Sequence, residues 1–135
     1  MFKFSQNKTR FVLSLFVVFA MIPVLGHSQT TIDIQVAPNV LNLQNNGQVV
    51  TIHTDIAYSA VLASTVSLNG IVIDSWKADA QGYFVAKFVM EAIKNLPLNI
   101  GEMNELTVNG EKVSGETFTG TSEVLVKNVI PKGRK

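Results

Sequence analysis

The sequence predicts an all-β fold, an antiparallel β-sandwich of about seven or eight strands with one short helix. Three observations support this prediction. Apolar and polar residues alternate in short runs, which is the pattern of strands with one buried face. Turn-forming residues such as Asn-Gly separate these runs every 8 to 12 residues or so. The one stretch with helical spacing is short and ends before a proline.

The first strands are expected in the alternating run at residues 32–36 and in the apolar run that restarts after Pro38, which removes a backbone donor. Asn45–Gly47 then predicts a reversal of the chain, because asparagine and glycine tolerate the backbone angles of tight turns. Val50 and Ile52 should form the inward face of the strand that follows.

The middle of the chain is predicted to hold a connection and two hairpins. Residues 55–64 are too apolar for a free loop and should lie across one end of the core. Asn69–Gly70 is the strongest hairpin signal, because both residues accept the positive φ of a type I′ turn. Lys77–Gly82, with the sequence KADAQG, provides the next turn. The strand at residues 83–89 then points Phe84, Ala86 and Phe88 to one face.

The C-terminal part supplies the helix and the last strands. Met90–Leu96 has apolar residues at helical spacing, and Pro97 ends it. Leu106 and Val108 precede a second Asn-Gly pair at Asn109–Gly110, which the sequence marks as another turn. The closing runs end in Phe118 and in Val124 to Val129.

Residues 1–28 have the layout of a secretory signal peptide. Three basic residues precede an apolar run over Phe11–Gly26, which is shorter than the roughly 20 residues of a membrane-spanning helix. Cleavage is predicted after Ser28, with a cut after Gly26 as the alternative and an uncleaved membrane anchor as the rival interpretation. We therefore expect an exported protein, periplasmic or extracellular.

Residues 29–130 are predicted to form a single sandwich domain, followed by a basic tail at residues 131–135. The whole chain has eleven Lys and Arg against ten Asp and Glu residues. Loss of Lys3, Lys8 and Arg10 with the signal peptide leaves a net charge of about −2, which disfavours nucleic acid as a partner. There is no cysteine, so packing alone must hold the domain together, without disulfides.

Three stretches carry a resemblance to a known family: APNVLNLQNNGQVVTIHTDI, STVSLNGIVIDSWKADAQGYFVAKF and ELTVNGEKVSGETFTGTSEVLV. Together they resemble a small immunoglobulin-like, cohesin-like sandwich domain of exported bacterial and archaeal proteins. The resemblance covers nearly all of the chain after residue 28, and it rests on turns and core positions. It implies an immunoglobulin-like fold and assigns no catalytic residue. Ala57, where the family has a proline, and Glu123 depart from the family pattern and weaken any inference of a shared partner.

Candidate sites for acid–base or metal chemistry are sparse. His53 and Asp55 share one face of a strand, but no nucleophile is identifiable beside them, so His53 is predicted to be a solvated strand residue with no catalytic role. Asp74, Asp79 and Gln81 precede Gly82 in a weak likeness to a calcium loop. The spacing does not fit an EF-hand, and a looser calcium site on Asp74 or Asp79 stays open. No cofactor or metal site is predicted.

The aromatic hairpin is the one binding candidate. If Trp76 and Tyr83 both face outward across the turn, they form an exposed aromatic patch flanked by Asp74 and Lys87. Such a patch stacks on sugar rings or anchors a protein partner. The alternative is that Trp76 caps the edge of the core.

The expected function is therefore a non-enzymatic binding or structural module, with an unidentified protein or polysaccharide as partner and membrane contact only through the signal segment. A carbohydrate-binding accessory module is the alternative. An inhibitor of a secreted hydrolase, presenting a loop at residues 58–64, is a weaker hypothesis. An enzyme is the third class, and the scattered acidic residues give no spacing that predicts a catalytic cleft.

Overall fold

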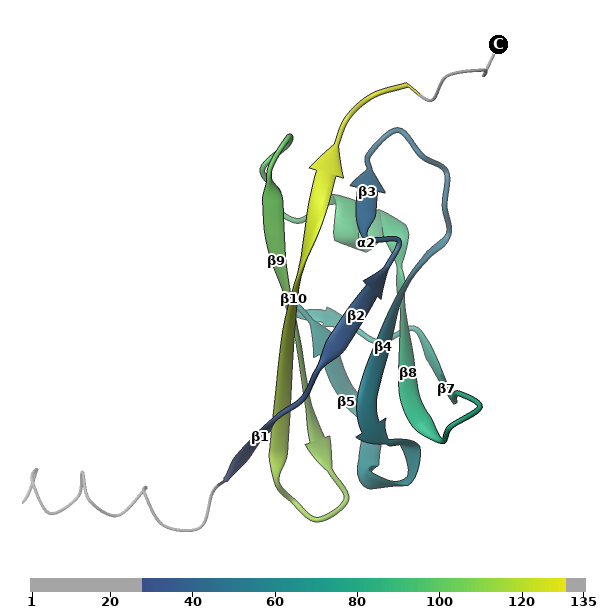
Figure 1. Cartoon of the computed structure of the whole chain (residues 1–135), viewed down its shortest axis with the longest axis vertical. Helices are drawn as coiled ribbons and strands as arrows, with labels where there is room; N and C mark the ends of the chain where they lie inside the picture. Colours follow the sequence, from purple (N-terminus) through teal and green to yellow (C-terminus); the bar gives the residue numbers. More distant parts are fainter. Residues whose placement is uncertain (1–27, 131–135) are drawn as a thin grey trace, which may run out of the picture.

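A computed structural model describes residues 28–130, which form two β-sheets facing each other with a lone α-helix (Figure 1). The all-β prediction is confirmed at this level. Sheet A contains β1 (Gln29–Thr31), β3 (Val40–Asn42), β5 (Val61–Leu68), β6 (Ile71–Val72), β9 (Met103–Lys112) and β10 (Thr117–Lys127). Sheet B contains β2 (Ile34–Ala37), β4 (Val49–Ala57), β7 (Ser75–Ala78) and β8 (Tyr83–Val89). The predicted signal peptide, except Ser28, and the basic tail lie outside the described residues.

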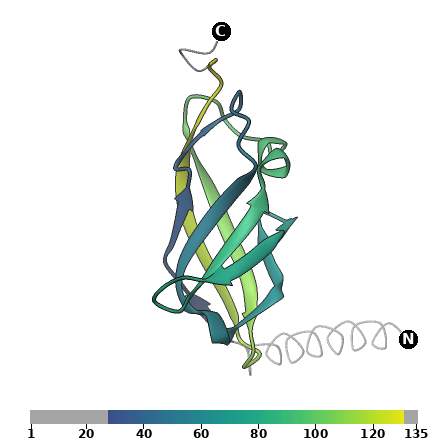
Figure 2. The ribbon, with the colours of Figure 1, turned by 90° about the vertical axis from the view of Figure 1, so that its right-hand side faces the viewer.

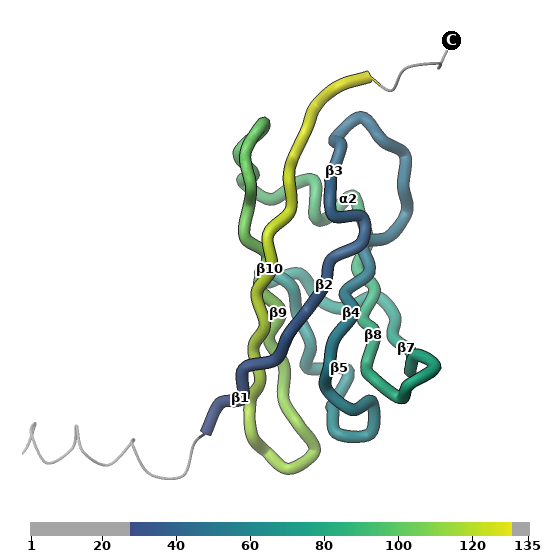
Figure 3. The backbone as a smooth tube through the Cα atoms, in the orientation of Figure 1, coloured from purple at the N-terminus to yellow at the C-terminus, as the bar shows by residue number. Residues whose placement is uncertain are grey.

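The prediction of a purely antiparallel sandwich is wrong for sheet A. Both β1 and β3 run parallel to β10, whereas β9 and β5 pair antiparallel with their neighbours. The cause is the path of residues 29–42, which follow one edge of β10 while their middle part, β2, crosses to sheet B and pairs with β4 (Figure 3). Splitting the chain in this way produces short strands, and residues 28–130 hold ten strands, whereas about seven or eight were predicted.

The other side of the sandwich is closed by a similar crossing. β6 pairs with β5 in sheet A, and β7, which begins three residues later, pairs with β8 in sheet B. Figure 2, which turns the molecule by a quarter, shows the two sheets as layers enclosing the core. At each side of the sandwich, therefore, one continuous segment of the chain passes from sheet A to sheet B: from β1 to β2 on one side and from β6 to β7 on the other.

The core consists of the inward residues of both sheets, and its largest fully buried side chains are Phe84, Phe88 and Phe118. Two polar residues are buried with them, and both are hydrogen-bonded. The hydroxyl of Thr54 donates to the carbonyl oxygen of Phe84 at 2.6 Å. The amide of Asn104 accepts a hydrogen bond from the backbone N–H of Asn99 and donates to its carbonyl, which closes the loop after the helix.

Two of the Asn-Gly pairs lie in different secondary structure: one forms a turn and the other lies inside a strand. Asn69 and Gly70 have φ values of 48° and 86° and join β5 to β6, so the predicted type I′ hairpin is confirmed. Asn109–Gly110 lies inside β9, and the predicted turn is wrong. Gly110 serves packing, because a Cβ there would lie 2.6 Å from Cζ of Phe118 on the neighbouring strand.

The predicted helix is confirmed as α2 (Met90–Lys94), which buries Met90 and Ile93. The prediction of a connection over residues 55–64 is wrong, because β4 continues to Ala57 and only the 3-10 turn η2 (Tyr58–Ala60) separates it from β5.

Neither helix within residues 28–130 is long and apolar enough to cross a membrane.

One pH effect is expected where the chain enters the sandwich. In a chain that keeps Ser28, its hydroxyl donates to the carboxylate of Glu116 at 2.5 Å, and this bond, followed by those from the Lys112 ammonium, lowers the pKa of Glu116 below 4.5. The test therefore uses protein that retains Ser28, because the predicted cut after Ser28 would remove this donor. Because the folded pKa is depressed, the stabilisation is present above about pH 4.5 and is lost as the pH falls through the lowered pKa. Glu116→Gln should therefore reduce stability near neutral pH and converge with wild type in acid. Urea denaturation from pH 7 to pH 2 measures this, and a constant difference across the range would contradict it.

Candidate functional site

The outer face of sheet B is built from side chains that the strand register places in rows. One row crosses all four strands and contains Gln35, His53, Val85 and Lys77. Val85 is fully buried although it lies on this outer face, because neighbouring side chains cover it. The rest of the row is exposed and polar, so this face offers hydrogen-bonding groups to solvent or to a ligand.

A β-bulge shapes this face next to His53. The pairing of β4 with β8 shifts between His53 and Ala57, so that β4 carries extra residues against its partner. The Thr54 hydroxyl fills the interrupted ladder by bonding to the Phe84 carbonyl. Asp55 faces outward beside the bulge, and its Oδ1 accepts the backbone N–H of Asp33 at 3.0 Å. The bulge therefore brings two aspartates from different strands together.

The turn between β7 and β8 forms the opposite wall. Oδ1 of Asp79 accepts the backbone N–H groups of Gln81 and Tyr83, both at 2.9 Å. Gly82 has a φ of 89°, which is why this turn position favours glycine. The turn predicted from KADAQG is thus confirmed, and Asp79 fixes the backbone from which the Tyr83 side chain projects.

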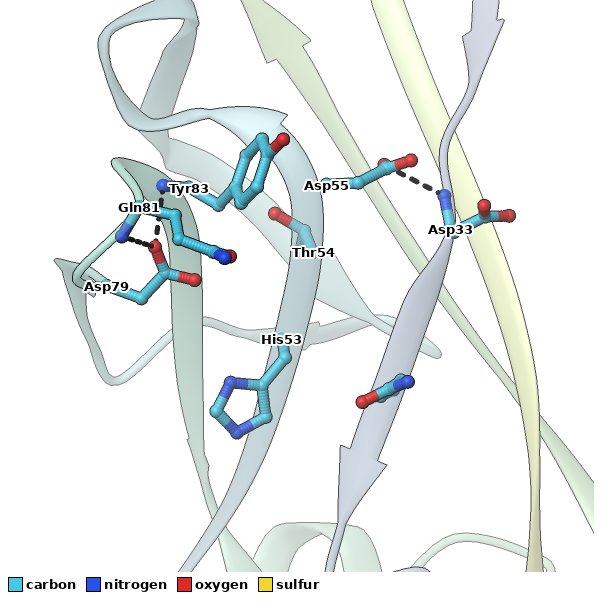
Figure 4. Close-up of a pocket in the computed structure, with 8 residues that line it drawn as sticks. Asp33, His53, Thr54, Asp55, Asp79, Gln81 and Tyr83 are labelled. Atoms are coloured by element: carbon cyan, nitrogen blue, oxygen red, sulfur yellow. Dashed lines mark hydrogen bonds between the residues drawn. The ribbon is translucent and has the colours of Figure 1, made fainter.

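Between the bulge and this turn lies a pocket of about 390 Å³, open to solvent. Figure 4 shows Asp79 and Gln81 on the turn side, Asp33 on the side of β2, and Tyr83, Thr54 and Asp55 between them. The lining groups are three carboxylates, two amides, an imidazole, a phenol and a hydroxyl, from Asp33, Gln35, His53, Thr54, Asp55, Asp79, Gln81 and Tyr83. Most of these side chains are exposed, so the pocket is able to exchange hydrogen bonds with a polar ligand.

The predicted aromatic patch is not formed. Trp76 pairs with Ala86, a core-facing residue, so Trp76 belongs to the inner side of β7, whereas Tyr83 lines the pocket on the outer face. The two side chains are 42% and 38% exposed, each on its own side of the sheet. The prediction that Trp76 faces outward was based on simple alternation along one strand. It is wrong because the chain changes sheets between Val72 and Ser75, and this change places Trp76 on the inner side.

The flanking residues Asp74 and Lys87 are near each other but do not line the pocket. The backbone N–H of Asp74 donates to the carbonyl of Lys87 at 2.9 Å, and Lys87 lies in the row of Thr51 and Ser75. Of the predicted binding residues, only Tyr83 belongs to the pocket.

His53 is an outward strand residue, as predicted, and it also lines the pocket with Asp55. Asp33 and Gln35 are the polar positions of the alternating run at residues 32–36, where the sequence predicts the first strand. It gave no means to pair that strand with β4, so the contribution of β2 to the pocket was missed. Among residues 28–130, no group of three His, Cys, Asp or Glu side chains is placed to hold a metal ion.

Comparisons with known proteins complete the description of the site. No family model, no curated protein and no solved structure matches the chain.

Proposed function

We propose that this protein is an exported, non-enzymatic β-sandwich module that binds carbohydrate, at the cell envelope or outside the cell. The immunoglobulin-like, cohesin-like family identity is part of the same proposal. The observation that carries it is the pocket, where the half-exposed ring of Tyr83 stands beside amide, imidazole and carboxylate groups. The proposed ligand is a sugar residue of a surface or extracellular polysaccharide.

Sugar rings match this combination of groups. They present apolar C–H faces that pack on an aromatic ring, and hydroxyl groups that donate and accept hydrogen bonds. Gln35 and Gln81 supply both donors and acceptors, and Asp33 and Asp55 supply acceptors. A volume of about 390 Å³ lies within the range of small-molecule sites.

The non-enzymatic part of the proposal is supported by what surrounds His53. The only hydroxyl side chains that line the pocket are those of Thr54 and Tyr83. The Thr54 hydroxyl already donates to the Phe84 carbonyl and is buried. Within the part of the chain that the structure describes, His53 therefore has no serine, cysteine or free threonine in the same pocket to activate as a nucleophile.

A hydrolase inhibitor is less well supported, because its candidate loop is not a protruding loop. Residues 58–60 form the 3-10 turn η2, and residues 61–64 belong to β5.

The test is an array of envelope and plant glycans probed with the purified protein. We expect binding to at least one glycan class, and Tyr83→Ala should weaken that binding by about tenfold, because the stacking surface is lost. Tyr58→Ala is the matched control: Tyr58 is 39% exposed but lies outside the pocket, and its removal should leave binding within about twofold. Circular dichroism verifies that both variants fold. Absence of binding to every glycan, or equal binding by the Tyr83 variant, would refute the proposal.

A further inference from the structure

We infer that the pocket selects sugars without acid groups and binds an amino sugar more tightly than the neutral sugar of the same backbone. This inference rests on the carbohydrate-binding function proposed above and adds the charge class of the ligand.

The lining of the pocket is acidic. Among residues 28–130, Asp33, Asp55 and Asp79 line it, and no lysine or arginine does. Both ion pairs within residues 28–130 lie elsewhere, between Lys94 and Glu91 and between Lys112 and Glu116.

Oxygen atoms of these carboxylates remain available to a ligand. Asp55 and Asp79 each use Oδ1 to hold the backbone, through Asp33 in one case and through Gln81 and Tyr83 in the other. Within the described residues, no hydrogen bond engages their Oδ2 atoms or the side chain of Asp33. An ammonium group brings three donors and a positive charge, which suits such acceptors.

The cations nearest in the sheet register do not reverse this polarity. Lys77 lies in the row of Gln35 and His53 but is separated from His53 by Val85 on the strand between them. Lys87 lies in the next row, opposite Thr51, and neither lysine lines the pocket. Residues 28–130 hold five lysines against ten acidic residues, so the surrounding field is also negative. A carboxylate on the ligand would meet like charge at close range.

Tyr83 and the amides provide the part of the site that does not depend on charge. They contact the ring and hydroxyl groups that neutral, amino and acidic sugars share. The readout of charge selection is therefore the ratio of the affinities for the three sugar forms, because substitution of the aspartates also alters acceptors that all three forms share.

The experiment measures titrations of the intact protein with one glycan backbone in three forms: neutral, 2-amino and uronate. The backbone is the one that gives the strongest array signal. At low ionic strength we expect the uronate form to bind about tenfold weaker than the neutral form, and the amino form several-fold tighter. Salt at about 0.5 M should narrow both differences, because these carboxylates are solvent-exposed.

The decisive variant is Asp33→Asn with Asp55→Asn, which keeps the shape and the acceptor that holds the Asp33 backbone. In this variant Asp79 is the one aspartate left in the described lining, so the differences in affinity among the three forms should shrink. Asp74→Asn is the matched control, because this exposed carboxylate lies outside the pocket and should leave the selectivity unchanged. Asp79 is left intact because it holds the turn.

The outcomes separate the two proposals. Binding of the uronate form as tightly as the neutral form, or unchanged selectivity in the double variant, would overturn the charge inference while the carbohydrate function stands. Binding of no glycan at all would overturn the proposed function and this inference with it.

Discussion

Phe118→Ala is expected to lower the free energy of unfolding by about 3–5 kcal/mol. The ring is 1% exposed, on the inner face of β10, and is one of the three largest fully buried side chains. Its removal leaves a cavity beside a backbone that the unbroken β9–β10 ladder, from Thr117 to Leu125, holds in place, so the cavity cannot collapse freely. Urea unfolding followed by fluorescence measures the change. Phe118→Leu, which keeps most of the volume, should lose clearly less, and equal losses would contradict the cavity argument.

The same ring explains a glycine in the strand beside it. A Cβ at Gly110 would lie 2.6 Å from Cζ and 2.8 Å from Cε2 of Phe118. Gly110→Ala should therefore destabilise the wild-type protein by about 1–3 kcal/mol and cost less in the Phe118→Leu background. A double-mutant cycle measures this coupling. If the two substitutions change the free energy of unfolding additively, the Phe118 ring is not the reason that position 110 requires glycine.

Gly120→Ala is the second large effect that we expect, at about 1–3 kcal/mol. A Cβ at this position would lie 2.7 Å from Cγ2 of Ile34 and 2.9 Å from the backbone oxygen of Ile32. The obstacle includes backbone, so the segment that crosses from β1 to β2 has to move away from β10.

Hydrogen exchange makes this displacement visible. Protection of the amide of Ile32, which donates to the carbonyl of Thr119 at 2.8 Å, should fall in the Gly120 variant. Glu123→Ala is the control, since Glu123 is exposed on the outer face of the same strand. Unchanged protection at Ile32 would mean that the crossing tolerates the methyl group.

The parts of the fold that follow from local chemistry could be predicted from the sequence. Asn69–Gly70 needs only residues that accept positive φ, and the turn before Tyr83 needs only Asp79 and Gly82. Helix α2 follows from apolar spacing and the proline after it. In each case, the residues that determine the structure are neighbours along the chain.

What could not be predicted depends on pairing between distant strands. Gly110 looks like a turn residue until Phe118 is known to lie opposite it. Trp76 looks outward until the change of sheets before β7 is known. The pocket has the same origin, since Asp33 and Gln35 come from a strand whose partner, β4, no local pattern specifies. The sequence therefore singled out Tyr83, His53 with Asp55, and Asp79 with Gln81 as separate candidates, but it did not predict that they line one pocket.

The path of the N-terminal segment also sets the order in which the domain is completed. Gln29 pairs with Thr117 and Val40 with Leu125, so β1 and β3 find their places only on the last strand, whereas β2 between them pairs with β4. A ribosome or a translocation channel releases β1 and β3 long before β10, and during that time they lack the edge that they join. Such long-range ladders form late and slowly. The delay suits the export that we propose, because it keeps the emerging chain in the extended state that a narrow channel admits.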